Sequence, residues 1–208
     1  MTGFFMLVTV DETGRGGVEL SRKALSVRDM MLVSLFAAMT AVAGQISIPL
    51  PMVPITLQTL IVMLAGSVLG ARKGAASMGL LILLAAVGAP VLSGWKGGLG
   101  ALIGPTAGFI WSWPIAAFLI GWMTERIAPN LRFWKLIPIH LGFGSVIIFA
   151  CGVGWLHFMA GLGWGTAVST GVLPFIPGDL AKVVVASTIA PALYRAYPVI
   201  RPRRVAEE

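Results

Sequence analysis

Long apolar segments alternate along this chain with short connections that are polar or rich in proline and glycine. Six of these segments have about the length that an α-helix needs to cross the roughly 30 Å hydrocarbon core of a bilayer. They cover residues 30–48, 55–71, 75–91, 105–124, 136–156 and 178–194. The pattern therefore predicts an all-α integral membrane protein whose six transmembrane helices form a single bundle.

The first helix has a start signal, because Asp29 follows Ser26 at the spacing of a capping box. Residues 26–196 are predicted to form the six-helix transmembrane domain, without a repeat or a linker that would divide it. Residues 1–25 are predicted to be a cytoplasmic leader, because their short apolar patch lacks the basic region and cleavage site of a signal peptide. Residues 197–208 are predicted to be a basic cytoplasmic tail.

Composition and charge agree with a membrane protein. The 208 residues are 57% hydrophobic and 11% charged, whereas a soluble domain carries about 25% charged residues. A net charge of +7 can indicate nucleic-acid binding, but of the 15 Lys and Arg only Lys96 lies on the outer side and Lys182 within a span. Because basic residues favour the cytoplasmic side, both termini are predicted to be cytoplasmic. The bilayer is the expected partner, and nucleic acid is not.

Asp179 and Lys182 are the two charges that cannot easily reach a membrane surface. Their i, i+3 spacing in the first turn of the last apolar segment places them on one helix face. Ionisable groups inside an apolar segment are costly, which points to a function, and the first helix amides favour a negative charge at Asp179. The alternative is a structural ion pair at a helix end.

Two loops are predicted to meet this charged helix start at the outer end of the bundle. One is the proline-rich stretch 49–54 and the other is the glycine-rich stretch 94–104. Their convergence predicts a pocket that opens outward and suits a small, partly polar molecule.

Three motifs carry a resemblance to a known family. Residues 54–60 (PITLQTL), residues 97–100 with 104–108 (GGLG and GPTAG) and residues 177–182 (PGDLAK) resemble, in order and spacing, the BioY family. That family comprises the biotin-specific substrate-binding (S) components of energy-coupling factor (ECF) transporters. The resemblance extends from about residue 26 to residue 194.

The resemblance implies a binding protein and not an enzyme. It implies capture of biotin at the outer face of the cytoplasmic membrane of a prokaryote, with biotin as the transported ligand and no cofactor. Its partners would be a transmembrane coupling (T) subunit and two ATP-binding subunits. The chain has no P-loop motif, so ATP-driven transport requires such partners. Whether the chain also forms a homo-oligomer stays open.

The charged residues fit the chemistry of biotin. Asp179 can accept hydrogen bonds from the ureido N–H groups, and Lys182 can donate to the ureido oxygen while Asp179 balances its charge. Lys96 can then meet the carboxylate. The opposite arrangement, with Lys182 on the carboxylate, stays equally open.

Three further residues in or near the motifs are candidates for ligand contact. Gln58 and Thr106 can each supply hydrogen bonds, and Trp95 can cover the apolar part of the ligand. Each has a structural alternative. Gln58 can satisfy backbone groups at a helix start, Thr106 can cap a helix, and Trp95 can anchor the membrane interface.

Ala37 and Ala41 have the small-xxx-small spacing that lets another helix approach closely. In the superfamily of S components, an Ala-xxx-Ala motif on the first span docks onto the coupling subunit, so the resemblance implies this role here. Packing within the chain is the alternative.

Two other functions are alternatives to biotin binding. An S component or facilitator for another small vitamin could use the same fold. An intramembrane hydrolase is less well supported, because His140 and His157 are predicted to lie at the interfaces and no Gly-x-Ser-x-Gly elbow exists. No metal site is predicted, since the two His and Cys151 lack ligand spacing.

Overall fold

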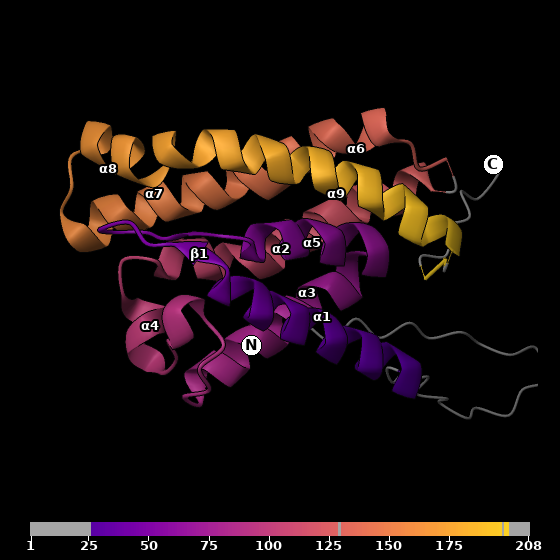
Figure 1. The fold of residues 1–208 in the computed structure, drawn as a ribbon, viewed down its shortest axis with the longest axis horizontal. Coiled ribbons are helices and arrows are strands. Elements are labelled where there is room, and N and C mark those ends of the chain that lie inside the picture. Colours follow the sequence, from indigo (N-terminus) through magenta and orange to yellow (C-terminus); the bar gives the residue numbers. More distant parts are fainter. Residues whose placement is uncertain (1–25, 129, 197, 200–208) are drawn as a thin grey trace, which may run out of the picture.

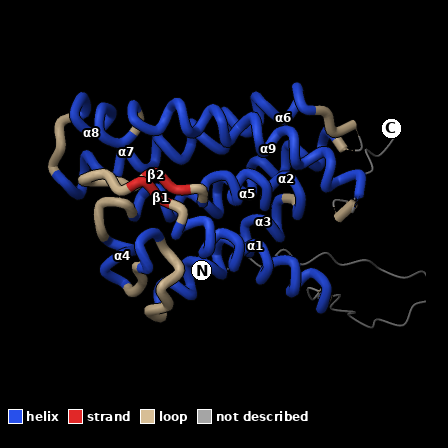
Figure 2. The backbone as a smooth tube through the Cα atoms, viewed as in Figure 1, coloured by secondary structure: helices blue, strands red, loops and turns tan. Residues whose placement is uncertain are grey.

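The computed structural model describes residues 26–128, 130–196 and 198–199, and the predicted leader and almost all of the predicted tail lie outside them. Helices dominate the described chain (Figures 1 and 2). The α-helices are α1 Val27–Gln45, α2 Gln58–Leu69, α3 Ala71–Ala86, α4 Leu99–Ile103, α5 Ala107–Ile127, α6 Phe133–Ile139, α7 Ile147–Ala160, α8 Trp164–Gly171 and α9 Ile176–Ala196. A π-helical segment, η2 His140–Val146, joins α6 to α7, and 3₁₀ turns occupy Ser93–Trp95 (η1) and Leu173–Phe175 (η3).

The start of α1 follows the predicted capping signal. Ser26 is the N-cap, and its hydroxyl accepts a hydrogen bond from the Asp29 N–H at 3.2 Å. The proline-rich stretch after α1 forms a short antiparallel hairpin, in which β1 Ser47–Ile48 pairs with β2 Ile55–Thr56.

Among the described residues, four helical segments are long and apolar enough to cross a membrane. They are Val27–Gln45, Ala107–Ile127, the continuous Phe133–Ala160, and Trp164–Ala196. The predicted second and third spans are shorter than expected: α2 has 12 residues and α3 has 16. Residues 55–56 are in the hairpin, and α3 ends before Gly88, whose φ of 96° does not suit a helix. The chain is thus a multi-pass helical membrane protein.

Helix α2 lies at the centre of the bundle (Figure 1) and contacts α1, α3, α5 and α9. Residues 61–69 are all buried, as expected for a helix that is apolar on every side. Gly70 ends α2 and starts α3 without a loop between them, and its φ of 84° suits glycine. Arg72 and Lys73 therefore belong to the first turn of α3.

Small residues allow the helices to approach closely. A Cβ atom at Gly66 of α2 would lie 2.7 Å from the Ala117 carbonyl oxygen of α5. A Cβ atom at Gly121 would overlap the backbone at Gly70 and Ala71, and one at Gly108 would overlap Trp155 of α7. Helices in lipid associate through such close packing.

Charged side chains collect at the end of the bundle where α1 and α3 begin and α5 ends. Lys73 pairs with Asp29 at 2.6 Å, and the Glu125 carboxylate accepts the Ala71 N–H at 2.8 Å. The guanidinium of Arg126 lies 3.6 Å from the centre of the Trp122 ring. The Glu125 contact satisfies an amide at the positive end of the α3 dipole.

His140 lies in the core, so the prediction of an interfacial position was wrong. Its Nε2 lies 2.6 Å from the Ser67 hydroxyl of α2, and its Nδ1 lies 2.9 Å from the Ser187 hydroxyl of α9. All three residues are 0% exposed. A neutral imidazole has one donor and one acceptor nitrogen, and a hydroxyl can serve either. This polar bridge joins three helical segments, and its residues do not line the cavity described below.

Replacing Ser67 with alanine is expected to destabilise the protein, because the buried Nε2 of His140 loses its partner. Such a loss costs on the order of 1–3 kcal/mol. Ser145→Ala is the matched control, since the buried Ser145 hydroxyl has no partner among the described residues. Thermal unfolding in detergent should show a lower midpoint for Ser67→Ala and no loss for Ser145→Ala. Equal losses would contradict a stabilising bridge.

Candidate functional site

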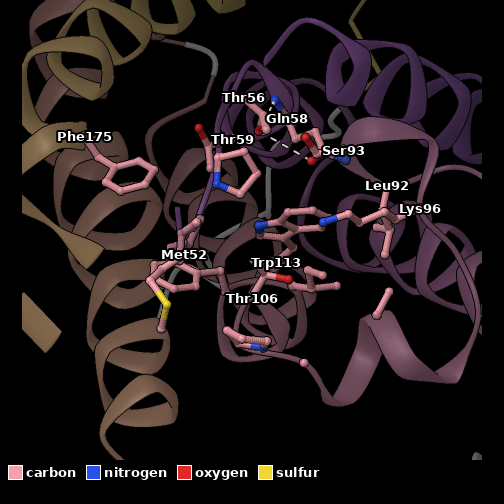
Figure 3. Close-up of a pocket in the computed structure, with 18 of the residues that line it drawn as sticks. Met52, Thr56, Gln58, Thr59, Leu92, Ser93, Lys96, Thr106, Trp113 and Phe175 are labelled. Atoms are coloured by element: carbon pink, nitrogen blue, oxygen red, sulfur yellow. Dashed lines mark hydrogen bonds between the residues drawn. The ribbon is translucent and has the colours of Figure 1, made fainter. Parts of the chain in front are cut away.

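A cavity of about 730 Å³ lies at the end of the bundle opposite the charged cluster. It is lined by the hairpin loop, the starts of α2 and α9, the glycine-rich segment, and the inner faces of α5 and α7 (Figure 3). Small-molecule sites commonly have volumes of roughly 300–1,000 Å³. The two loops and the charged helix start that were expected to meet do line one pocket.

Asp179 and Lys182 lie on the wall of this cavity that α9 provides. They are 5% and 7% exposed, and the Lys182 ammonium lies 3.7 Å from one Asp179 carboxylate oxygen. The ammonium also donates a hydrogen bond to the Thr59 hydroxyl of α2 at 2.9 Å. The pair is thus compensated in charge and is attached to the neighbouring helix.

Gln58 lies at the start of α2, next to Thr59 (Figure 3). Its side chain is buried against Gly44 of α1, where an added Cβ would lie 2.7 Å from Nε2. Thr56 fixes this residue through two contacts: its hydroxyl accepts the Gln58 backbone N–H at 3.3 Å and lies 3.4 Å from Oε1. The amide Nε2 is left without a partner among the described residues.

The mouth of the cavity is formed by the loop that carries Trp95 and Lys96, and both are exposed. Gln45 at the end of α1 holds this loop: its amide accepts the Trp95 backbone N–H at 3.0 Å and donates to the Leu92 carbonyl at 3.0 Å. Trp95 has a φ of 59°, which is uncommon for a residue with a side chain. Thr106 also lines the cavity, just before α5, and its side chain makes no helix-capping hydrogen bond.

All six residues predicted to contact a ligand line this cavity. Within the described part of the chain, four buried side-chain atoms have no hydrogen-bond partner, and three of them belong to cavity residues: Gln58 Nε2, Trp113 Nε1 and Asp179 Oδ2. Buried polar groups are usually paired. Two donors and one acceptor that belong to cavity residues are therefore unpaired in this structure. The described residues contain no group of His, Cys, Asp and Glu that could hold a metal.

The sequence analysis did not single out several cavity residues. Thr59 lies inside a quoted motif, and its hydroxyl was the available signal. Trp113 and Phe175 line the cavity as well. Each is an aromatic residue in an apolar stretch, so the sequence offered no signal that separates them from core residues.

The predicted docking residues lie on α1, away from the cavity. Ala37 is 1% exposed and Ala41 packs against the core, so in this structure they take part in packing within the chain. The neighbouring Ala38 and Val42 are exposed instead. A partner would reach Ala37 only if α1 moved, and the docking role stays a prediction.

Comparison with known proteins gives consistent matches. The model of the BioY family matches residues 19–199. The biotin transporter BioY of Rhizobium etli is 40% identical over 187 residues, which cover 86% of this chain and 100% of the relative. The biotin transporter BioY of Thermotoga maritima is 38% identical over 79% of this chain and 94% of the relative.

A solved structure matches the fold. It is the crystal structure of the S-component for biotin from an ECF-type ABC transporter. The TM-score is 0.75 with 31% sequence identity, and the match covers 81% of this chain and 92% of the other. The similarity in fold therefore extends over most of this chain.

Proposed function

The chain belongs to the BioY family, and from this membership and the cavity we propose that it captures biotin at the outer face of the membrane. It is a transport protein and not an enzyme, and it acts as the substrate-binding component of an ECF-type transporter. Residues 26–196 form its transmembrane substrate-binding domain.

The observation that carries this proposal is the set of unpaired polar atoms in the cavity. The biotin ureido ring has two N–H donors and one carbonyl acceptor. Asp179 Oδ2 lacks a donor, and Gln58 Nε2 lacks an acceptor. Lys182 keeps N–H groups beyond the one that it donates to Thr59. The ureido ring would therefore complete the hydrogen bonding of these buried groups.

Burial favours one orientation of the ligand. Burying a neutral ureido ring costs less than burying a carboxylate, and the Asp179–Lys182 pair is buried whereas Lys96 is exposed. In our proposal the ring lies against Asp179, Lys182 and Gln58, with Thr106 as a further hydrogen-bonding neighbour. The carboxylate meets Lys96 at the mouth, beneath Trp95.

A six-span topology with both termini in the cytoplasm is the arrangement that we propose for this domain. The segments would be α1, α2, α3, α5, the continuous α6–α7 helix and α9. At one end of the bundle α1 begins and α9 finishes (Figure 1). Among the described residues, the charged ones lie in segments at that end, apart from Lys96 and the Asp179–Lys182 pair. The positive-inside rule makes that end cytoplasmic, so the cavity opens outward.

Transport would depend on partner chains, namely a coupling T subunit and two ATP-binding subunits. We propose that the coupling subunit docks on α1. The burial of Ala37 favours contact through the exposed face around Ala38 and Val42, which is 66% exposed. Ala37 and Ala41 would join the contact only after a shift of α1.

Titration calorimetry of the detergent-purified chain alone tests the function directly. Biotin should bind, whereas riboflavin and thiamine should not, because neither ligand carries a cyclic urea with two ring N–H groups from which Asp179 can accept hydrogen bonds. Binding of another vitamin in place of biotin would contradict the proposed ligand.

Lysine substitutions test the orientation of the ligand. Lys182→Ala should weaken the binding of both biotin and biotin carboxamide by more than about tenfold, because Asp179 also loses its partner. Lys96→Ala should weaken the binding of biotin but leave the binding of the uncharged carboxamide unchanged. Lys135→Ala, an exposed change outside the cavity, is the control. The reverse pattern at Lys96 and Lys182 would place the carboxylate on Lys182.

A bulky residue on the outer face of α1 tests docking. Ala38→Trp should prevent co-purification with co-expressed coupling and ATP-binding subunits while the isolated chain still binds biotin. Ala37→Trp is the comparison, and it should lower the stability of the isolated chain because Ala37 is buried. Normal assembly of Ala38→Trp would argue against this docking face.

A further inference from the structure

Trp113 differs from two other tryptophans of the same region in its hydrogen bonding. The indole N–H of Trp111, also on α5, donates to the Leu102 carbonyl at 3.0 Å, and that of Trp155 donates to the Gly104 carbonyl at 2.9 Å. Trp113 is 4% exposed and lines the cavity, yet its indole N–H has no partner among the described residues. The protein satisfies the first two groups internally and leaves the third, in a residue that lines the cavity, without an acceptor.

The chemistry of the indole limits what this group can bind. Its N–H is a donor only, and a buried tryptophan usually finds an acceptor. The charged groups on the α9 wall are already compensated, since Lys182 contacts both Asp179 and Thr59. An acceptor atom that enters the cavity with a ligand would pair the indole N–H.

We propose that Trp113 is a specificity-determining residue whose indole N–H donates a hydrogen bond to the ureido oxygen of the ligand. This inference rests on the proposed function. A carbonyl oxygen has two lone pairs, so it can accept from Trp113 and from a second buried donor, Gln58 or Lys182. The aromatic ring adds apolar contact at the same place.

The arrangement selects ligands by the acceptor that they carry. Figure 3 shows Trp113 between the wall that carries Gln58 and Thr59 and the side that carries Thr106. A ligand ring whose oxygen reaches Trp113 accepts a hydrogen bond from the indole N–H. A ligand ring without an acceptor leaves this buried N–H unpaired. Sites built in this way discriminate strongly against ligands that lack the matching group.

Two matched variants provide the affinity test. Trp113→Phe keeps an aromatic ring and removes the N–H, so biotin should bind about tenfold more weakly or worse. Trp111→Phe removes an N–H that bonds to the backbone outside the cavity. The biotin affinity of this variant should stay within about twofold of that of the unaltered protein. The loss at Trp113 should persist with biotin carboxamide, because the contact is to the ring and not to the carboxylate.

A second measurement does not depend on how well the variant folds. In the unaltered protein with ¹⁵N-labelled tryptophan, the Trp113 indole N–H signal should shift on addition of biotin and exchange more slowly with water. Three results would each overturn the assignment to Trp113 and leave the proposed function standing. They are normal biotin affinity of Trp113→Phe, a loss of affinity that disappears with biotin carboxamide, and an indole signal that does not shift on addition of biotin. Absence of biotin binding by the unaltered protein would overturn the proposed function, and this assignment with it.

Discussion

Close packing around α2 is the constraint on which the rest of the structure depends. This helix has only 12 residues, and it is buried on every side. Gly66 allows α5 to approach, and Gly121 allows α5 to reach the turn at Gly70. Because interiors are packed at high density, a side chain at either position would displace a whole helix. The position of α2 in turn places Thr59 beside Lys182 of α9, where the cavity forms.

The bundle separates its charges between two ends, with consequences for binding. At one end, Asp29, Lys73 and Glu125 have partners that tie helix ends together. At the other end, Asp179 and Lys182 compensate each other inside the cavity. A neutral polar ring can therefore enter without creating an uncompensated buried charge, which would be costly. The unpaired polar atoms near this pair determine how the ligand is oriented and which ligands are selected.

The mouth of the cavity depends on α1 as well as on its own loop. Gln45 holds the backbone just before η1 at Leu92 and at the last residue of η1, Trp95. The positive φ of Trp95 is a strained conformation that the surrounding contacts must maintain. The position of Lys96 at the rim is thus coupled to the end of the helix on which we propose that the coupling subunit docks.

The sequence by itself determined the class of the protein and most of the cavity. Apolar length identified a helical membrane protein, Ser26 and Asp29 marked the first helix, and the isolated charges at Asp179 and Lys182 located the pocket. These signals are local, since hydrophobic period, capping and burial cost act over a few residues. Only the tertiary structure decided the lengths of α2 and α3, the burial of Ala37 and His140, and the inclusion of Trp113 in the cavity. Those properties depend on which helix faces lie opposite each other, and a nearly uniform apolar sequence does not encode that choice locally.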